Sequence, residues 1–207
     1  MPEMRDRAAI VLSGGQSSRM GQPKEWLDFR GRPLLAHVVD LLLSRASTVV
    51  VVARAEQALP SLRPEVTRLD DPVFEQGPQG PLPALTKGLV WLADRGCSTA
   101  YLSSCDAAGL SASHLDQLAS LLDEVGPSYE AVLPVSNDGQ EHPLAALVRV
   151  EPAARAAKLV ELRQERRLRS LFVELRTKRI SERDLRDPEV LRAFNTEAEW
   201  RALLGSR

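Results

Sequence analysis

The sequence has few cysteines, few aromatic residues, no long apolar run and almost no net charge. Its only two cysteines, Cys97 and Cys105, lack metal-ligand spacing, so we expect them to be reduced thiols. A net charge of −1 gives no general field toward nucleic acid or a membrane surface, and we expect neither as a partner. No apolar stretch reaches the roughly 20 residues of a membrane-spanning helix. Residues 1–7 are charged rather than an apolar signal core. We therefore expect a cytoplasmic protein.

Two familiar phosphate-binding motifs are also missing. A Walker A loop ends in Gly-Lys-Ser/Thr, and a dinucleotide fingerprint reads G-x-G-x-x-G. Residues 12–24 read L-S-G-G-Q-S-S-R-M-G-Q-P-K instead, directly after an apolar run of strand length. Gly14 and Gly15 have no side chains, so backbone N–H groups can approach an anion closely, and Arg19 and Lys24 add positive charge. This stretch predicts a polyphosphate cradle at the end of a buried strand.

Apolar runs and helical periodicity alternate along the first 124 residues, which predicts a parallel sheet with right-handed crossovers. Strands are expected at residues 8–12, 48–53, 66–69 and 99–103, and helices at 33–45, just before 62, at 82–94 and at 112–124. After that the order changes, with strands at 131–135 and 144–148, helices between 152 and 175, a last strand at 177–180 and a capped terminal helix. We expect one domain whose C-terminal third is an insertion or lid around the sheet.

Residues 12–24 resemble the L-[AS]-G-G-x-S-x-R-M-G-x-x-K signature of nucleotidyltransferases related to molybdenum cofactor guanylyltransferase, the MobA family. The resemblance implies an α/β fold, a three-layer α/β/α sandwich with a mostly parallel sheet of the nucleotide-diphosphosugar transferase type. It implies a single domain, 1–207, whose N-terminal half binds the NTP and whose residues from about 131 bind an acceptor. It places the following residues at the nucleotide: Leu12, Ser13, Gly14, Gly15, Lys24, Asp71, Gly80, Pro81, Leu82 and Asp106.

Asp106 directly follows a predicted strand, at the sheet edge that also carries the glycine-rich turn. A carboxylate there can hold Mg²⁺ against phosphates, because Mg²⁺ takes one or two protein carboxylates and fills its shell with phosphate oxygens and water. The segment Cys105-Asp106 is similar to the family's P-C-D-x-P motif, without either proline. The alternative is a helix-capping or loop aspartate. We predict a metal ligand.

The nucleotide base is the part of the substrate that the sequence specifies least. Asp71 corresponds to a nucleotide-site aspartate in the family, but turn chemistry before Pro72 explains it nearly as well. Residues 77–82 resemble the family's G-P-L-[AS]-G loop against the purine, although the glycine after Leu-Ala is missing. Ala53 and Arg54 stand where the family often has a base-binding asparagine. Guanine is therefore implied by resemblance alone.

Three later features concern the acceptor. His142 and Pro143 resemble the family's His-Pro-[LT] segment, and Asn195 its N-[TV]-x-E segment, so the resemblance places all three at the acceptor. A structural histidine and a helix N-cap are equally good explanations of His142 and Asn195. Between residues 155 and 179, arginine and lysine outnumber glutamate nine to three. We favour a solvated helix face there; the alternatives are a site for an anionic acceptor and one for a partner protein.

The implied reaction transfers a nucleoside monophosphate, GMP from GTP, to the phosphate of molybdenum-loaded molybdopterin and releases pyrophosphate. Arg19, Lys24 and Asp106 would be catalytic, Mg²⁺ the cofactor, and a molybdoenzyme or cofactor-handover protein the recipient of the product. Alternatives are a cytidylyltransferase for the same cofactor, a sugar- or polyol-phosphate nucleotidyltransferase, and a non-catalytic nucleotide-binding regulator. Intact Arg19, Lys24 and Asp106 argue against the last.

Overall fold

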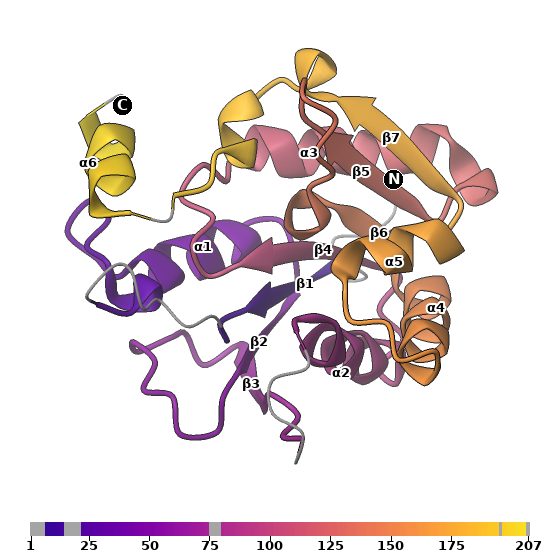
Figure 1. The fold of residues 1–207 in the computed structure, drawn as a ribbon, viewed down its shortest axis with the longest axis horizontal. Coiled ribbons are helices and arrows are strands. Elements are labelled where there is room, and N and C mark those ends of the chain that lie inside the picture. The colour runs from indigo at the N-terminus through magenta and orange to yellow at the C-terminus, as the bar shows by residue number, and fades with distance from the viewer. Residues whose placement is uncertain (1–6, 15–21, 75–79, 195, 206–207) are drawn as a thin grey trace.

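The computed structural model describes residues 7–14, 22–74, 80–194 and 196–205. Seven strands form one sheet in the order β3-β2-β1-β4-β6-β5-β7 (Figure 1). The strands are β1 (Arg7–Leu12), β2 (Thr48–Ala53), β3 (Val66–Asp70), β4 (Thr99–Ser104), β5 (Ala131–Val135), β6 (Leu147–Arg149) and β7 (Thr177–Ser181). β1 to β4 are mutually parallel, whereas β6 runs antiparallel to both β4 and β5. The mostly parallel α/β architecture is the one predicted.

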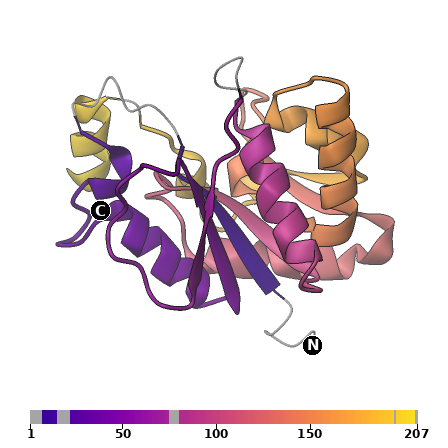
Figure 2. The same ribbon diagram turned by 90° about the horizontal axis from the view of Figure 1, so that it is seen from below.

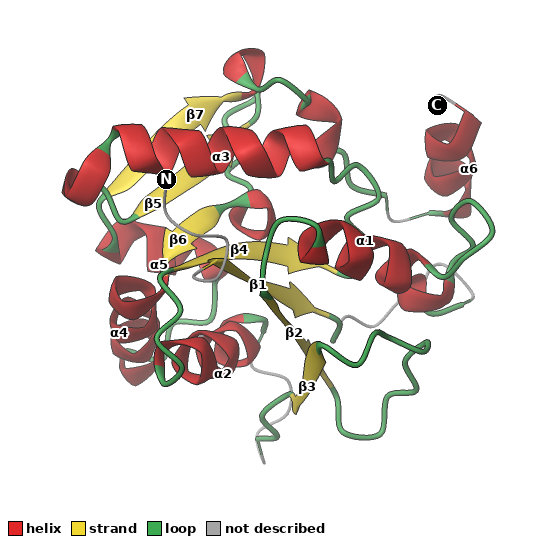
Figure 3. Ribbon diagram, turned by 180° about the vertical axis from the view of Figure 1, so that it is seen from behind, coloured by secondary structure: helices red, strands yellow, loops and turns green. Residues whose placement is uncertain are grey.

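Helices cover both faces of this sheet, as the edge-on view in Figure 2 shows. They are α1 (Leu34–Leu43), α2 (Leu82–Ala93), α3 (Ala112–Glu124), α4 (Val150–Leu162), α5 (Leu168–Glu174) and α6 (Glu197–Gly205). One core cluster joins α1, α3 and α6 to the sheet, and a second joins α2, α4 and α5. Figure 3 shows α1 and α3 lying across the first of these faces. The result is a three-layer sandwich.

Burial on both faces explains the composition of the central strands. In β1, Ala9 and Val11 enter one core cluster while Ile10 and Leu12 enter the other. β2 is likewise buried from Val49 onward, as expected for a strand that helices cover on both sides. β3, at the sheet edge, is only partly buried and carries polar residues. The hydrophobic runs therefore mark the middle of the sheet.

Three details of the fold differ from the sequence-based expectations. Residues 54–65 contain no helix, because Pro60 and Pro64 have no backbone N–H to donate to a helical hydrogen bond. The C-terminal third is not a lid, because β5, β6 and β7 continue the same sheet. The sixth strand begins at Leu147 rather than 144, since Pro143–Ala145 forms a 3-10 turn, η4. The terminal helix is capped as expected, by reciprocal hydrogen bonds between Thr196 and Glu199.

Candidate functional site

The chain reverses its direction across the sheet between β1 and β4. β2 and β3 extend from one side of β1, and β4 lies on the other, so the ends of β1 and β4 form a topological switch point. Leu12 accepts a hydrogen bond from the N–H of Cys105 at 3.0 Å, and the N–H of Ser13 donates to Val52 at 2.8 Å. These bonds hold the start of the glycine-rich turn against both neighbouring strands. We call the sheet edge where β1 to β4 end the carboxyl edge.

Lys24 and Asp106 meet at this switch point. The Lys24 ammonium lies 2.6 Å from Oδ2 of Asp106 and donates to the carbonyl of Phe194 at 2.7 Å. Their side chains are only 15% and 25% exposed. The same ammonium lies 4.8 Å from the centre of the Phe194 ring. The predicted phosphate-binding lysine and the predicted metal-binding carboxylate are thus brought into direct contact.

Asp71 lies at the same edge, directly after β3. Its N–H donates to the carbonyl of Ala53, and a side chain on Gly14 would place Cβ 3.1 Å from Oδ2 of Asp71. Burial raises the pKa of the Asp71 carboxyl, and the positive charges of Lys87 and Arg54 act against that rise. The carboxylate therefore faces the beginning of the glycine-rich turn.

The segment Gly80-Pro81-Leu82 leads into α2. Gly80 has φ +75° and packs closely on the connection between α4 and α5, because an added Cβ would lie 3.0 Å from the carbonyl oxygen of Arg166. Leu82 is fully buried. The Leu82 side chain therefore belongs to the core and is not available to a ligand.

The thiol of Cys105 contributes no nucleophile to the site. Burial, followed by the nearby Asp106 carboxylate, raises the pKa of this thiol to about 12. It stays protonated at neutral pH and hydrogen-bonds with Ser13.

A close backbone contact brings the C-terminal segment to the site. A Cβ on Gly109 would lie 2.1 Å from the carbonyl oxygen of Glu189, which only a glycine can avoid without a shift of the chain. The segment from Glu189 continues to Phe194, whose carbonyl binds Lys24. Gly109 therefore permits the approach of the segment whose Phe194 carbonyl accepts a hydrogen bond from Lys24.

His142 lies in the connection between β5 and β6. Its ring Nε2 lies 3.1 Å from Oγ of Ser136, and its backbone N–H donates to the carbonyl of Pro134. Burial lowers the pKa of its imidazole, while the charges of Asp138 and Glu182 act in the opposite direction. Pro143 begins the η4 turn. Both residues lie in the connection that follows the carboxyl end of β5 and leads to β6.

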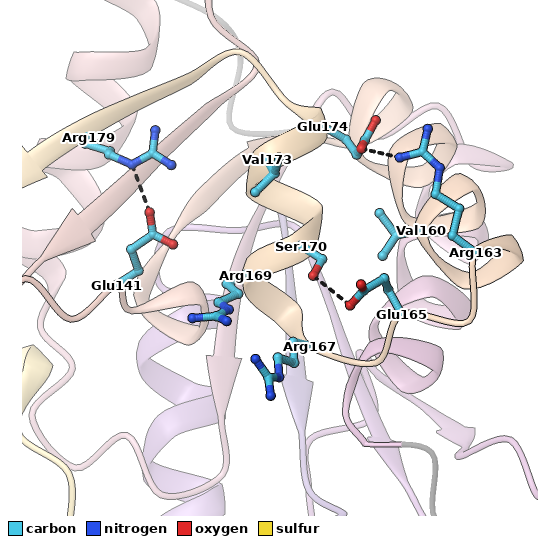
Figure 4. Close-up of a pocket in the computed structure, with 10 residues that line it drawn as sticks. All are labelled: Glu141, Val160, Arg163, Glu165, Arg167, Arg169, Ser170, Val173, Glu174 and Arg179. Atoms are coloured by element: carbon cyan, nitrogen blue, oxygen red, sulfur yellow. Dashed lines mark hydrogen bonds and ion pairs between the residues drawn. The ribbon is translucent and has the colours of Figure 1, made fainter.

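A cleft of about 590 Å³ opens beside this region, between α4, α5 and β7 (Figure 4). We call it the arginine cleft, and its lining residues are Glu141, Val160, Arg163, Glu165, Arg167, Arg169, Ser170, Val173, Glu174 and Arg179. Arg163 pairs with Glu174 at 2.6 Å and Arg179 with Glu141 at 2.8 Å. Arg167 and Arg169 project from the beginning of α5, and neither forms an ion pair with another described residue. The basic segment is therefore a concave surface as well as a solvated one.

Three predicted site residues, Gly15, Arg19 and Asn195, fall outside the described residues. Within the described ranges, no three His, Cys, Asp or Glu side chains gather as a metal cluster. No helix in those ranges has the length and apolarity to cross a membrane.

Sequence reasoning also missed residues that shape the site. Gly109 belongs to no motif. Glu25 and Gln57 form a hydrogen bond of 2.6 Å between Nε2 of Gln57 and Oε1 of Glu25, and the only signal for this pair in the sequence is the position of Glu25 next to Lys24.

Comparison with known proteins matches residues 9–180 to the MobA-like NTP transferase domain. A protein of Mycolicibacterium paratuberculosis named probable molybdenum cofactor guanylyltransferase is 36% identical, with all of both chains aligned. Among solved structures, molybdopterin-guanine dinucleotide biosynthesis protein A of Archaeoglobus fulgidus is 18% identical, with a TM-score of 0.72 and 97% of each chain covered. A 4-diphosphocytidyl-2C-methyl-D-erythritol synthase of Anaerococcus prevotii shares the fold at a TM-score of 0.68, with 9% identity and 99% of each chain covered.

The family match and the full-length relative agree with the motif, the sheet order and the paired Lys24 and Asp106. The chain therefore belongs to the family of MobA-like NTP transferase domains and is a nucleotidyltransferase.

Proposed function

We propose that this protein transfers GMP from GTP to the terminal phosphate of molybdenum-loaded molybdopterin and releases pyrophosphate. The names of its full-length relatives support the substrate pair. The observation that carries the proposal is the contact between Lys24 and Asp106, two charged residues distant in sequence that meet at the switch point of the sheet. Such a site binds and neutralises phosphate groups.

The reaction asks for positioning and charge neutralisation more than for acid–base chemistry. An oxygen of the acceptor phosphate forms a bond to the α-phosphorus of GTP, the bond from that phosphorus to the bridging oxygen breaks, and pyrophosphate leaves with the electron pair. A phosphate dianion needs no general base to attack. Lys24 and Arg19 balance the charge of the triphosphate and of the leaving pyrophosphate, and the backbone N–H groups of Gly14 and Gly15 bind phosphate oxygens.

The donor set fits a magnesium ion that is bound mainly by substrate. Asp106 offers a single carboxylate, and the described residues hold no cluster of three ligating side chains beside it. Mg²⁺ is commonly held by one or two carboxylates together with substrate phosphates. When bound, it would neutralise charge on the triphosphate. Lys24 pairs with Oδ2 of Asp106, so the lysine and the metal ion would share this carboxylate.

Main-chain groups of Gly80, Pro81 and Leu82 are our candidates for base recognition, because Leu82 buries its side chain and Ala53 offers no polar group. Asp71 belongs to the nucleotide site as an acceptor for hydroxyl or amide donors. A carboxylate beside the phosphate-binding turn would repel the phosphates themselves.

We place the acceptor at His142 and Pro143 and in the arginine cleft beside them. Asn195, which lies outside the described residues, stays a candidate for the acceptor from its motif alone. The cleft adjoins both halves of the site: Glu141 precedes His142, and Arg166 contacts Gly80. The guanidinium groups of Arg167 and Arg169, which form no ion pair within the described ranges, suit an anionic acceptor. A protein that receives the product would approach from this open side.

The test is incubation with each NTP, Mg²⁺ and molybdenum-loaded molybdopterin, with pyrophosphate release and product mass as readouts. We expect turnover with GTP and a product heavier by one GMP. Turnover with CTP instead would make the chain a cytidylyltransferase. Transfer only to sugar or polyol phosphates would replace the acceptor, and GTP binding without pyrophosphate release would indicate a regulator.

A further inference from the structure

Glu25 is a buried carboxylate with no role in the reaction described above. It lies in the 3-10 turn η2 (Lys24–Trp26), directly after Lys24, and is only 4% exposed. Burying a charged carboxylate is costly unless hydrogen bonds replace its water. Its partner is Gln57, whose Nε2 donates to Oε1 of Glu25 at 2.6 Å.

Gln57 connects this carboxylate to the ends of two central strands. It is 9% exposed, and its Nε2 also lies 3.4 Å from Oγ of Ser13, the residue after β1. Its Oε1 accepts from the N–H of Arg54, directly after β2, at 3.3 Å. Both ends of the amide are therefore used. Trp26 adds a second link from η2 to the same segment, donating from Nε1 to the carbonyl of Ala58 at 3.0 Å.

This anchorage decides where Lys24 can point. A 3-10 turn has three residues per turn, so neighbouring side chains leave it about 120° apart. With Glu25 held inward by Gln57 and Trp26 tied to Ala58, the Lys24 side chain is left facing Asp106 and Phe194. Lys24 thus stands on a turn that two side-chain hydrogen bonds anchor, although it lies outside any long helix or strand.

We propose that Glu25 and Gln57 are positioning residues that aim the Lys24 ammonium at the nucleotide phosphates. This inference rests on the proposed function, because it takes Lys24 as the phosphate-binding cation. Glu25 and Gln57 touch no substrate themselves; they act through Lys24.

The test is a double-mutant cycle read by calorimetric binding of GTP and of guanosine, which lacks phosphates. Gln57→Leu leaves the Glu25 carboxylate without its donor, and we expect about 10-fold weaker GTP binding with unchanged guanosine binding. In a Lys24→Ala background the same substitution should cause no further loss of GTP affinity, because the group that it positions is gone.

Glu25→Gln provides a milder second variant in case Gln57→Leu does not fold, with an expected loss of about 3-fold in GTP affinity. A matched control is Gln117→Leu, which removes another buried glutamine, bonded to Asp184 and Arg186. It should lower the melting temperature without changing the ratio of GTP to guanosine affinity.

The phosphate role of Lys24 and the positioning role of Glu25 and Gln57 can be disproved separately. If Lys24→Ala alone leaves GTP binding unchanged, the proposed phosphate role of Lys24 is wrong. If Lys24→Ala weakens GTP binding but Gln57→Leu costs as much with Lys24 absent as with it present, or weakens guanosine equally, the positioning role is overturned.

Discussion

The carboxyl edge and the arginine cleft both carry charge, but they hold it in different ways. At the carboxyl edge, Lys24, Asp106 and Glu25 are largely buried, and each has a short hydrogen bond within the protein. In the cleft, Arg167 and Arg169 are exposed, and the ion pairs of Arg163 and Arg179 lie at the surface. Exposed pairs contribute about 0–1 kcal/mol, so a ligand can replace them at little cost. The first region is preorganised for one chemistry, whereas the second can adapt to its ligand.

The largest effect should come from the preorganised region. Lys24→Ala should lower GTP turnover about 10²–10³-fold, the usual loss for one preorganised charge-stabilising group. Lys158→Ala, which removes an exposed lysine from α4, is the matched control and should leave turnover unchanged. Steady-state pyrophosphate release measures both, and equal turnover in the two variants would remove Lys24 from the mechanism.

The next two variants test whether Lys24 and a metal ion compete for the Asp106 carboxylate at the carboxyl edge. Asp106→Asn should lose activity and magnesium dependence together, because an amide cannot neutralise the ion. Lys24→Met should bind Mn²⁺ about 10-fold more tightly than the wild type without nucleotide, since it removes a charge-assisted hydrogen bond from the carboxylate. Calorimetric titration with Mn²⁺ measures both affinities. If Asp106→Asn bound Mn²⁺ as tightly as the wild type does, the metal would have to be held by other residues.

Gly109→Ala tests whether close packing underlies the preorganisation. The new Cβ would meet the Glu189 carbonyl, and the forced shift should cost about 1–3 kcal/mol of unfolding free energy. GTP turnover should fall several-fold as well, because the displaced segment carries the carbonyl that holds Lys24. Glu189→Ala keeps the backbone oxygen and should be tolerated. An unchanged melting temperature in Gly109→Ala would show that the segment from Glu189 to Phe194 can move without loss of stability.

A smaller effect concerns pH. His114 is fully buried, with Nε2 3.1 Å from the Ala145 carbonyl, and burial lowers the pKa of its imidazole below 6.5. The unfolded chain then binds a proton more readily than the folded one. Stability should be full above about pH 7 and fall toward about pH 5. His114→Gln should reduce that loss in urea titrations at the two pH values; an unaltered loss would assign it to other groups.

The sequence predicted the parts of the fold that depend on local pattern. Apolar runs located β1, β2 and β4, and the helix expected at 112–124 is α3, which Ser111 caps by accepting a hydrogen bond from the N–H of His114. The predicted helix before residue 62 was wrong. That segment instead supplies Gln57 and Ala58 to contacts with η2.

The site was predictable only where a motif stands in one continuous stretch, as in residues 12–24. The contacts of Gln57 with Glu25 and of Gly109 with Glu189 join separate segments and follow no periodicity or motif. The arginine cleft was visible as charge, but its concave form depends on how α4, α5 and β7 pack. Such features require the tertiary structure.

The most direct test of this division between nucleotide edge and acceptor cleft is a pair of KM values in Arg169→Ala. We expect the KM for the molybdopterin acceptor to rise about 10-fold, as for the loss of a charged hydrogen bond, while the KM for GTP stays unchanged. Lys178→Ala, an exposed charge on β7, is the control and should change neither. A higher KM for GTP in Arg169→Ala, or an unchanged KM for the acceptor, would contradict the account.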